Sequence, residues 1–165
     1  DDIQKALRSG ADKVTVNTQA IKTPEFIRKA SERFGKQCIV GSIEAKKKQD
    51  SWEAYIDSGR EPTGIDVVEW ALKLEELGVG ELMLTSIDQE GTKKGCDIEL
   101  AKVICSNVNV PVIVSGGVGR PDHLVQLCNQ SSVDGAVVAS VLHYDLNTPE
   151  ELKEELSKNN IEVRL

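Results

Sequence analysis

The sequence is poor in aromatic residues and has no long apolar run. Phe, Trp and Tyr together make up 4% of its 165 residues, so the core has to be built from Val, Ile, Leu and Ala. Such residues are typical of parallel strands that are buried on both faces. A membrane-spanning helix needs about 20 consecutive apolar residues, and neither such a run nor a signal peptide is recognised. The sequence therefore predicts one globular domain without a membrane partner.

Metal-binding and nucleotide-binding patterns are missing too. The two histidines and four cysteines lack the spacing of a zinc site, and no Walker or nucleophile-elbow motif occurs. We therefore expect neither a metal nor a cofactor. Three of the cysteines lie in apolar surroundings, where a reduced thiol behaves as a small hydrophobe. Free thiols indicate a cytoplasmic protein.

Positive charge is scarce as well. The sequence has 20 Lys and Arg against 27 Asp and Glu, a net charge of −7. This balance argues against nucleic acid as a partner, because phosphate neutralisation needs clustered basic residues. The one dense basic run, Lys46–Lys48, is expected to be a solvated loop. A phosphorylated small molecule stays compatible, since backbone amides bind phosphate without side-chain charge.

What the sequence does have is a regular alternation of apolar strands and amphipathic helices. Strands are expected at residues 13–17, 38–44, 81–86, 112–115 and 135–140. Helices are expected at residues 2–9, 23–34, 65–77, 97–106, 121–128 and 148–158. Residues 46–61 are expected to form a polar loop with a small hairpin that turns at Ser58-Gly59. The alternation predicts an α/β domain with a parallel sheet and right-handed crossovers.

Two α/β architectures fit this alternation: a doubly wound open sheet and a (β/α)8 TIM barrel. A faint internal repeat favours the barrel, because residues 11–18 (ADKVTVNT) align with residues 133–140 (VDGAVVAS). A Thr-Pro-Glu helix start follows each copy, at Thr23 and Thr148. A complete barrel typically needs about 250 residues. We therefore expect residues 1–165 to form a partial TIM barrel with about five of its eight βα units.

Polar residues gather where the expected strands end, and barrels place their chemistry at these ends. A phosphate cradle is predicted from two neighbouring strand ends, with Ser115, Gly116, Gly117, Ala139 and Ser140. Glycines let the backbone approach a phosphate closely, although a tight turn would explain them equally well. Asn17-Thr18 holds the matching place in the repeat and suggests a second phosphate subsite, unless Asn17 simply ends its strand.

Carboxylates also follow two of the strands. Asp88 or Glu90 is a candidate for proton transfer, and the alternative is a polar loop whose acids face water. Glu44 ends an apolar strand, where an ionised group needs a partner or a role. At the opposite ends of the strands, Lys13 and Glu81 either pair at the barrel floor or are solvated separately.

Four segments resemble the cyclase subunit of imidazole glycerol phosphate synthase: GADKVTVNT, LTSIDQEGTKKGCD, PVIVSGGVG and EELKEELSKNNIEVRL. The resemblance covers residues 1–165 and implies a (β/α)8 barrel entered at the helix after the third strand. It implies that a glutaminase subunit, joined in a heterodimer, supplies ammonia. The family adds this ammonia to a bis-phosphorylated ribulosyl aminoimidazole-carboxamide. Its products are imidazole glycerol phosphate and an aminoimidazole carboxamide ribotide, in histidine biosynthesis.

The resemblance also implies roles for single residues. Glu90 corresponds to a catalytic acid–base Asp, and Glu44 corresponds to an auxiliary Asp. Substrate and phosphate contacts are expected at Asn17, Thr18, Thr85, Gly91, Ser115, Gly116, Gly117, Ala139 and Ser140. The ammonia gate and partner face are expected at Lys13, Glu81 and Asp12. The essential Asp of the family's first strand has no counterpart, so this segment alone is expected to be inactive.

Both Asp-to-Glu departures lengthen a carboxylate arm by one methylene. A shift of ~1 Å can cost about a hundredfold in rate, so the longer arms are compatible with a related substrate. One alternative is a paralogue that acts beside a glutaminase-like partner in amidino-sugar synthesis for surface polysaccharides. Another is a non-catalytic barrel that binds a phosphometabolite.

Overall fold

Five parallel strands form the centre of the molecule. The computed structural model describes residues 1–164, so the last residue of the segment EELKEELSKNNIEVRL lies outside the described residues. The strands are β1 (Val14–Val16), β2 (Ile39–Lys48), β5 (Glu81–Ser86), β6 (Val112–Ser115) and β7 (Gly135–Val137). All five expected strands are confirmed, and their order in the sheet follows their order in the chain. Because this order never reverses, right-handed crossovers place the helices on one face, as in a barrel.

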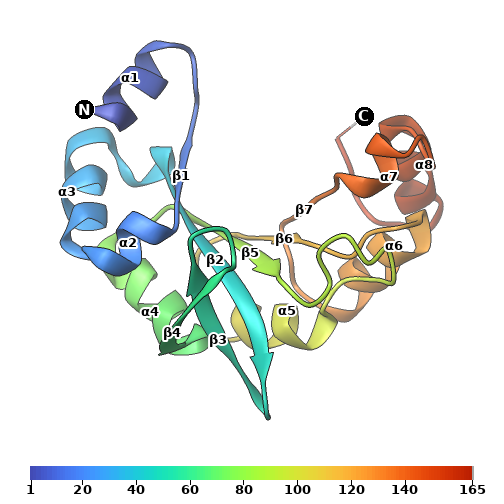
Figure 1. Ribbon diagram of the computed structural model, residues 1–165. Helices are drawn as coiled ribbons and strands as arrows, with labels where there is room; N and C mark the ends of the chain where they lie inside the picture. The colour runs from blue at the N-terminus through green and yellow to red at the C-terminus, as the bar shows by residue number, and fades with distance from the viewer. Residues whose placement is uncertain (165) are drawn as a thin grey trace.

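Helices follow the strands and cover the outside of the curved sheet. They are α1 (Asp2–Arg8), α2 (Thr18–Lys22), α3 (Glu25–Phe34), the short 3-10 turn η1 (Lys36–Cys38), α4 (Val67–Leu77), α5 (Ile98–Cys105), α6 (Pro121–Gln130), α7 (Ser140–His143) and α8 (Pro149–Lys158). Figure 1 shows α3, α4, α5 and α6 along the convex side, with β1 and β7 apart at the two ends of the arc. Within residues 1–164, β1 and β7 do not pair with each other, so the described sheet is open.

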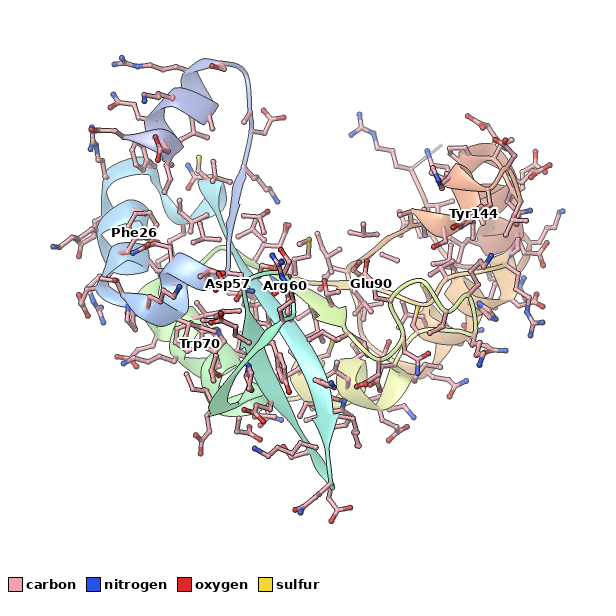
Figure 2. The ribbon with its side chains drawn as sticks, viewed as in Figure 1. Phe26, Asp57, Arg60, Trp70, Glu90 and Tyr144 are labelled. Carbon is pink, nitrogen blue, oxygen red and sulfur yellow. The ribbon has the colours of Figure 1, made fainter. Side chains whose placement is uncertain are left out.

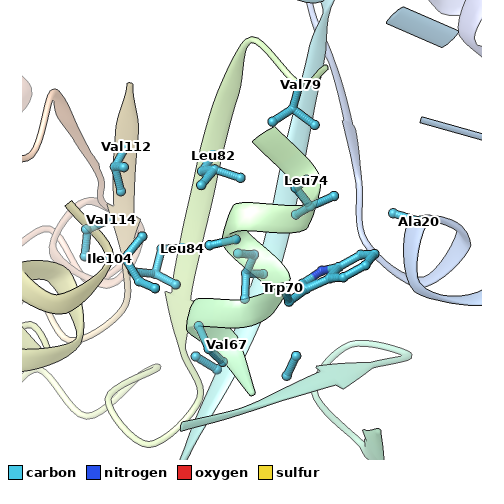
Figure 3. Packing of buried hydrophobic residues seen from close by; sticks show 14 of the residues in the cluster. Ala20, Val67, Trp70, Leu74, Val79, Leu82, Leu84, Ile104, Val112 and Val114 are labelled. Carbon is cyan, nitrogen blue, oxygen red and sulfur yellow. The ribbon is translucent and has the colours of Figure 1, made fainter. Parts of the chain in front are cut away.

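Helix α4 illustrates how the core is built. It begins at Val67, two residues later than expected, because the Asp66 side chain accepts from the backbone N–H groups of Val68 and Glu69 and caps the helix. Its buried face packs against β2 and β3, and Figure 3 shows its residues Val67, Trp70 and Leu74 among the buried side chains of the core. Burial of one such side chain contributes about 1.5–3 kcal/mol. The aliphatic core expected from the composition is thus confirmed.

Residues 46–61 are more regular than the polar loop expected from the sequence. Strand β2 runs on to Lys48, and β3 (Ser51–Ile56) and β4 (Glu61–Asp66) add to it as an antiparallel hairpin. The expected turn at Ser58-Gly59 joins β3 to β4. Lys47 Nζ lies 3.6 Å from the centre of the Trp52 ring, and Lys48 Nζ lies 2.7 Å from Glu53 Oε2. The basic run is therefore part of a strand and not a loop, which corrects that prediction, while all three lysines are exposed to solvent as expected.

Two predictions about element ends were wrong. Thr23 does not cap α3 with its side chain, because it ends α2, where its N–H donates to the Gln19 carbonyl over 3.0 Å. Helix α2 itself begins directly after β1 and was not expected. The last strand stops at Val137 rather than Ser140, and Ser140 begins α7. Short helical turns thus follow both strands of the internal repeat.

Candidate functional site

The carboxyl ends of the parallel strands meet at one edge of the sheet. In the strand register, Glu44 of β2 is the partner of Thr85 of β5. Thr85 in turn is the partner of Ser115 of β6. These three predicted site residues therefore lie in one row across three neighbouring strands. Glu44 was expected to end its strand, but it lies inside β2, because the hairpin extends this strand as far as Lys48.

A small pocket of about 30 Å³ lies where the last two strands end. Its lining includes all six residues predicted around the phosphate at this end, together with Glu90: Gly91, Ser115, Gly116, Gly117, Ala139 and Ser140. Segments far apart in the sequence, following β5, β6 and β7, thus converge on one point. Three glycines and the serines Ser115 and Ser140 contribute to this lining, and backbone N–H groups and hydroxyls are donors that suit an anion.

The glycine pair has a packing role as well as this position. Gly116 and Gly117 have φ angles of +103° and +90°, a region that other residues adopt only with strain. A Cβ atom at Gly117 would overlap the carbonyl oxygen of Gly95 in the loop after β5. The N–H of Gly95 donates to the carbonyl of Gly117 over 2.8 Å. The tight-turn alternative is therefore present in the structure, and the phosphate cradle stays a prediction for the same two glycines.

A second cavity, of about 320 Å³, lies beside this pocket. It is lined by Glu44, Ser58, Gly59, Thr85, Ile87 and Glu90. Glu90 borders both spaces, so the small pocket and the larger cavity adjoin. Figure 2 shows Glu90 in the same central region as Asp57 and Arg60, which belong to the turn between β3 and β4. Two carboxylates therefore face one cavity, next to a pocket suited to an anion.

Glu44 is held by two hydrogen bonds on one oxygen. Asn17 Nδ2 donates to Glu44 Oε2 over 2.7 Å, and the backbone N–H of Gly59 donates to the same oxygen over 2.8 Å. Asn17 Nδ2 also donates to the carbonyl of Tyr55 over 3.1 Å. Both acceptors fix which end of the amide faces Glu44. The carboxylate is thus oriented by β1 and by the β3–β4 turn together.

The expected subsite at Asn17-Thr18 lies beside the same turn. Thr18 Oγ1 accepts from the backbone N–H of Asp57 over 3.0 Å, which leaves the Thr18 hydroxyl hydrogen free to donate elsewhere. Lys22 Nζ lies 3.7 Å from Asp57 Oδ2. Asn17 has its amide nitrogen engaged by protein acceptors, and its Oδ1 is buried without a hydrogen-bond partner among the described residues.

The two acids of the loop after β5 differ in their surroundings. Asp88 Oδ2 accepts from the backbone N–H of Lys47 over 2.7 Å and so ties this loop to β2. Glu90 is exposed, while its backbone N–H donates to the carbonyl of Ser86 over 3.0 Å. Of the two candidates for proton transfer, Glu90 is therefore the one that lines the cavity with an uncommitted side chain.

At the opposite end of the strands, Lys13 and Glu81 form an ion pair. The Lys13 side chain is 47% exposed and the Glu81 side chain 14%, so the pair lies at the surface of the strands' amino ends. Asp12 is exposed beside Lys13. The pairing that the sequence left open is thus present, and it lies at the edge opposite the two pockets.

Ser58 and Gly59 are site residues that the sequence analysis did not assign. Ser58 has a φ angle of +60° and Gly59 of +73°, so the turn folds back and presents the Gly59 N–H to Glu44. The length of the polar segment 46–61 was a signal, since long loops in compact domains are usually functional. Its contact with Glu44 could not be inferred, because this contact joins residues on different strands.

Other reactive groups near the site are poorly suited to its chemistry. Burial raises the pKa of the Cys96 thiol to about 11, with Cys128 and Asp97 adding to the shift, so this thiol stays protonated near neutrality.

Among the described residues, no group of three or more His, Cys, Asp or Glu side chains is arranged to hold a metal ion. Within residues 1–164, no helix combines the length and the apolar character that crossing a bilayer requires.

Sequence comparison identifies known proteins to which this chain is similar. The family model described as histidine biosynthesis protein matches residues 1–148. Imidazole glycerol phosphate synthase subunit HisF of Methanococcus maripaludis is 47% identical over 186 aligned residues, which cover 100% of this chain and 68% of the relative. The subunit HisF of Lactococcus lactis subsp. cremoris is 48% identical over 167 residues, covering 100% and 64%. The chain thus spans about two thirds of the length of these relatives.

Proposed function

Because this chain belongs to the histidine biosynthesis protein family, we propose that it carries the ammonia-dependent cyclase activity of an imidazole glycerol phosphate synthase. The substrate is a ribulosyl aminoimidazole-carboxamide with a phosphate at each end. Its products are imidazole glycerol phosphate and an aminoimidazole carboxamide ribotide. The observation that carries the proposal is the shared cavity of Glu44 and Glu90, which adjoins the glycine-lined pocket.

Glu90 acts as a general acid or base in this proposal. Its side chain faces the cavity, and no hydrogen bond to a described residue commits it to another role. Proton transfer by a positioned side chain contributes about 10²–10⁴-fold to a rate. Glu44 assists from the neighbouring strand, where Asn17 and Gly59 fix one of its oxygens and leave the other for the substrate.

One phosphate of the substrate occupies the small pocket. Gly91, Gly116, Gly117 and Ser140 supply backbone N–H groups and a hydroxyl there, and such donors bind phosphate without requiring a basic side chain. The other phosphate lies at Asn17-Thr18, where the Thr18 hydroxyl is free to donate. Thr85, between the two acids in the strand register, contacts the middle of the substrate.

Ammonia reaches the site from the face that carries Lys13, Glu81 and Asp12. We propose that a glutaminase subunit docks at this face and that the Lys13–Glu81 ion pair gates the entry. The relatives are named as subunits of a synthase, which supports a role in an assembly. The four cysteines of the chain are free thiols, as expected for a protein of the cytoplasm.

The five parallel strands are, in this proposal, five of the eight strands of a closed barrel. Three observations support it: the parallel strands lie in chain order, the open edges of the parallel part are β1 and β7, and the relatives are longer than this chain. A barrel of eight strands has no free edge. Closure would bring β1 and β7 into one ring with the remaining strands.

The test joins the chain to the N-terminal strands of a HisF relative, because the segment alone is expected to be inactive. The joined protein is supplied with the bis-phosphorylated substrate and an ammonium salt, without any glutaminase. Formation of imidazole glycerol phosphate is expected, and Glu90→Gln is expected to lower it by at least about a hundredfold. Glu154→Gln, an exposed acid on α8, serves as the matched control and should leave turnover unchanged. A folded protein whose turnover is the same with and without the Glu90 carboxylate would refute the assigned role.

A second function is favoured by one observation: both site acids are Glu where the resembling family has Asp. A longer arm shifts the carboxylate within the cavity and thereby suits a related substrate. The alternative is the amidotransferase subunit of surface-polysaccharide amidino-sugar synthesis. Complementation of a histidine auxotroph separates the two, because only the histidine enzyme restores growth without histidine.

A further inference from the structure

We propose that Asp97 is a positioning residue for the loop that carries Glu90 and Gly91. The loop comprises residues 87–96 and connects β5 to α5. The inference rests on the proposed function, because it concerns the residue to which that function assigns proton transfer. Asp97 itself lines neither the cavity nor the small pocket, so its effect is exerted through the loop.

Asp97 joins the two ends of this loop. The residue follows the loop directly, and its Oδ2 accepts from the hydroxyl of Ser86, the residue that precedes the loop, over 3.4 Å. The same oxygen accepts from Trp52 Nε1 on β3 over 3.0 Å. Ser86 is 1% exposed and Trp52 is 6% exposed. Water therefore cannot readily replace either bond, and a buried donor left without its acceptor is costly.

Ser86 connects Asp97 to Glu90 through two hydrogen bonds. The Ser86 carbonyl accepts from the backbone N–H of Glu90 over 3.0 Å, while its hydroxyl donates to Asp97. A Cβ atom at Gly116 would lie 3.0 Å from the same carbonyl, so the glycine turn after β6 also packs against this point. Movement of Ser86 would thus displace both the proposed acid–base group and one wall of the phosphate pocket.

The hairpin supports the arrangement from its other side. Lys47 lies over the Trp52 ring at 3.6 Å, and its backbone N–H donates to Asp88 in the loop over 2.7 Å. Trp52 is therefore held between a cation and the Asp97 carboxylate. Since the hairpin also supplies the turn that bonds to Glu44, the two cavity acids are linked through one set of contacts.

Capping a helix would not by itself allow Asp97 to position the loop, and a second capping residue, Asp66, provides a comparison. Asp97 Oδ1 accepts from the backbone N–H of Leu100 and caps α5. Asp66 caps α4 in the same manner and also accepts from a serine hydroxyl, that of Ser51. None of the hydrogen bonds of Asp66 to described residues reaches the loop. Replacement of Asp66 is thus a matched control, because it removes a capping carboxylate that has no hydrogen bond to the loop.

The experiment compares Asp97→Ser with Asp66→Ser in the otherwise unchanged protein. Serine remains a good helix cap, but its short side chain cannot reach Trp52 and Ser86. Trypsin cleavage after Lys93 and Lys94, both exposed in the loop, reports how often the loop opens. We expect cleavage of Asp97→Ser to be at least about tenfold faster than wild type, the factor for loss of one hydrogen bond to a charged group.

The control should be cleaved at the wild-type rate, and Trp52→Phe, which keeps the ring but removes the donor, should give a smaller increase. In ammonia-driven turnover, Asp97→Ser should lower kcat more than it raises KM, with Asp97→Glu recovering part of the loss. Equal cleavage of Asp97→Ser and Asp66→Ser would overturn the proposal. Because cleavage needs no substrate, absence of turnover in the chain joined to the N-terminal strands would refute the proposed function, while this comparison still decides the role of Asp97.

Discussion

Asn17 donates a hydrogen bond from Nδ2 to Oε2 of Glu44 over 2.7 Å, and so joins the end of β1 to the middle of β2. The bond exists because β1 is short. It pairs with β2 only as far as Gly41, and β3 takes over the same edge of β2 from Glu44 onward. Asn17 lies at this junction of three strands, where its amide bonds to both β2 and β3.

Replacement of Asn17 by Asp is expected to make stability depend on pH. At neutral pH the new carboxylate would repel Glu44, and the two hydrogen bonds that Nδ2 donates would be lost, at a cost of about 1–3 kcal/mol. Two adjacent carboxylates share a proton, which raises the pKa of the pair in the folded state. A raised pKa in the folded state means that stability is gained as pH falls and lost as pH rises.

Melting temperatures between pH 5 and pH 8 provide the measurement. Asn17→Ala removes the same bonds without adding charge and serves as the control. We expect the difference in melting temperature between the Asp and Ala variants to shrink towards pH 5. Parallel curves for the two variants would show that the Asn17–Glu44 contact is not formed.

The length of the Glu90 side chain is expected to matter for catalysis. The cavity holds Glu at both acid positions, so Glu90→Asp would withdraw its carboxylate by about one carbon–carbon bond. Misplacement by ~1 Å can cost about a hundredfold in rate. We expect kcat to fall by about this factor, measured as product formation with saturating ammonium. An Asp variant as fast as wild type would indicate that the site tolerates either acid.

Gly117→Ala is expected to destabilise the protein more than Gly64→Ala. Both glycines have positive φ angles, +90° and +75°, so both substitutions carry backbone strain of roughly 1–2 kcal/mol. Only at Gly117 would the new methyl group overlap another backbone, that of Gly95. Overpacking adds about 1–3 kcal/mol.

Urea unfolding of the two variants isolates this difference, since Gly64 has open space around it. Phosphate protection against unfolding should also disappear in Gly117→Ala and persist in Gly64→Ala. If both variants lost equal stability, the contact between the loops after β5 and β6 would be absent.

Stability is expected to fall as pH drops below 6.5 because of His123. Burial, and secondarily the nearby Arg120, lower the pKa of His123 from its ordinary value of 6.5. Its Nδ1 accepts from the backbone N–H of Gly119 over 3.1 Å, so protonation would remove this acceptor. The unfolded chain then binds the proton more readily than the folded one. The His123 contribution is therefore complete above pH 6.5 and is lost as pH falls through the folded-state pKa.

The measurement is the free energy of unfolding in urea between pH 5 and pH 7.5. The hydrogen bond from Lys48 lowers the pKa of Glu53 from its ordinary value of 4.5. Glu53 therefore changes the free energy of unfolding only below pH 5. His123→Asn keeps an acceptor near Gly119 and should flatten the pH dependence. If the free energy of unfolding of His123→Asn changed with pH as steeply as that of wild type, the pH dependence would come from groups other than His123.

Much of the fold could be predicted from local patterns. The five parallel strands follow from apolar runs between turn residues, and helix α8 follows from the start predicted at Thr148, whose side chain caps the helix. These features depend on neighbours in the chain. The hairpin extension of β2 was missed because its charged surface, with Lys47 over Trp52, reads as a solvated loop when the cross-strand partner is unknown.

Some residues of the candidate site could likewise be predicted from local patterns, and others could not. Glycines and acids at strand ends could be identified because parallel strands bring their carboxyl ends to one edge. Asp97 and Gly59 could not, since their importance lies in bonds to Ser86, Trp52 and Glu44 on other elements. An isolated Asp before a helix is indistinguishable from an ordinary cap such as Asp66.

The sequence by itself determined the alternation of strands and helices, the aliphatic core and the set of polar residues at the strand ends. Periodicity and side-chain chemistry are local properties, and they need no knowledge of the partner strand. Only the tertiary structure decided that Glu44 and Glu90 face one cavity, that Asn17 orients the first and that Ser86 connects Asp97 to the second. Those contacts depend on strand register and loop packing, which are set when distant segments bury their surfaces against each other.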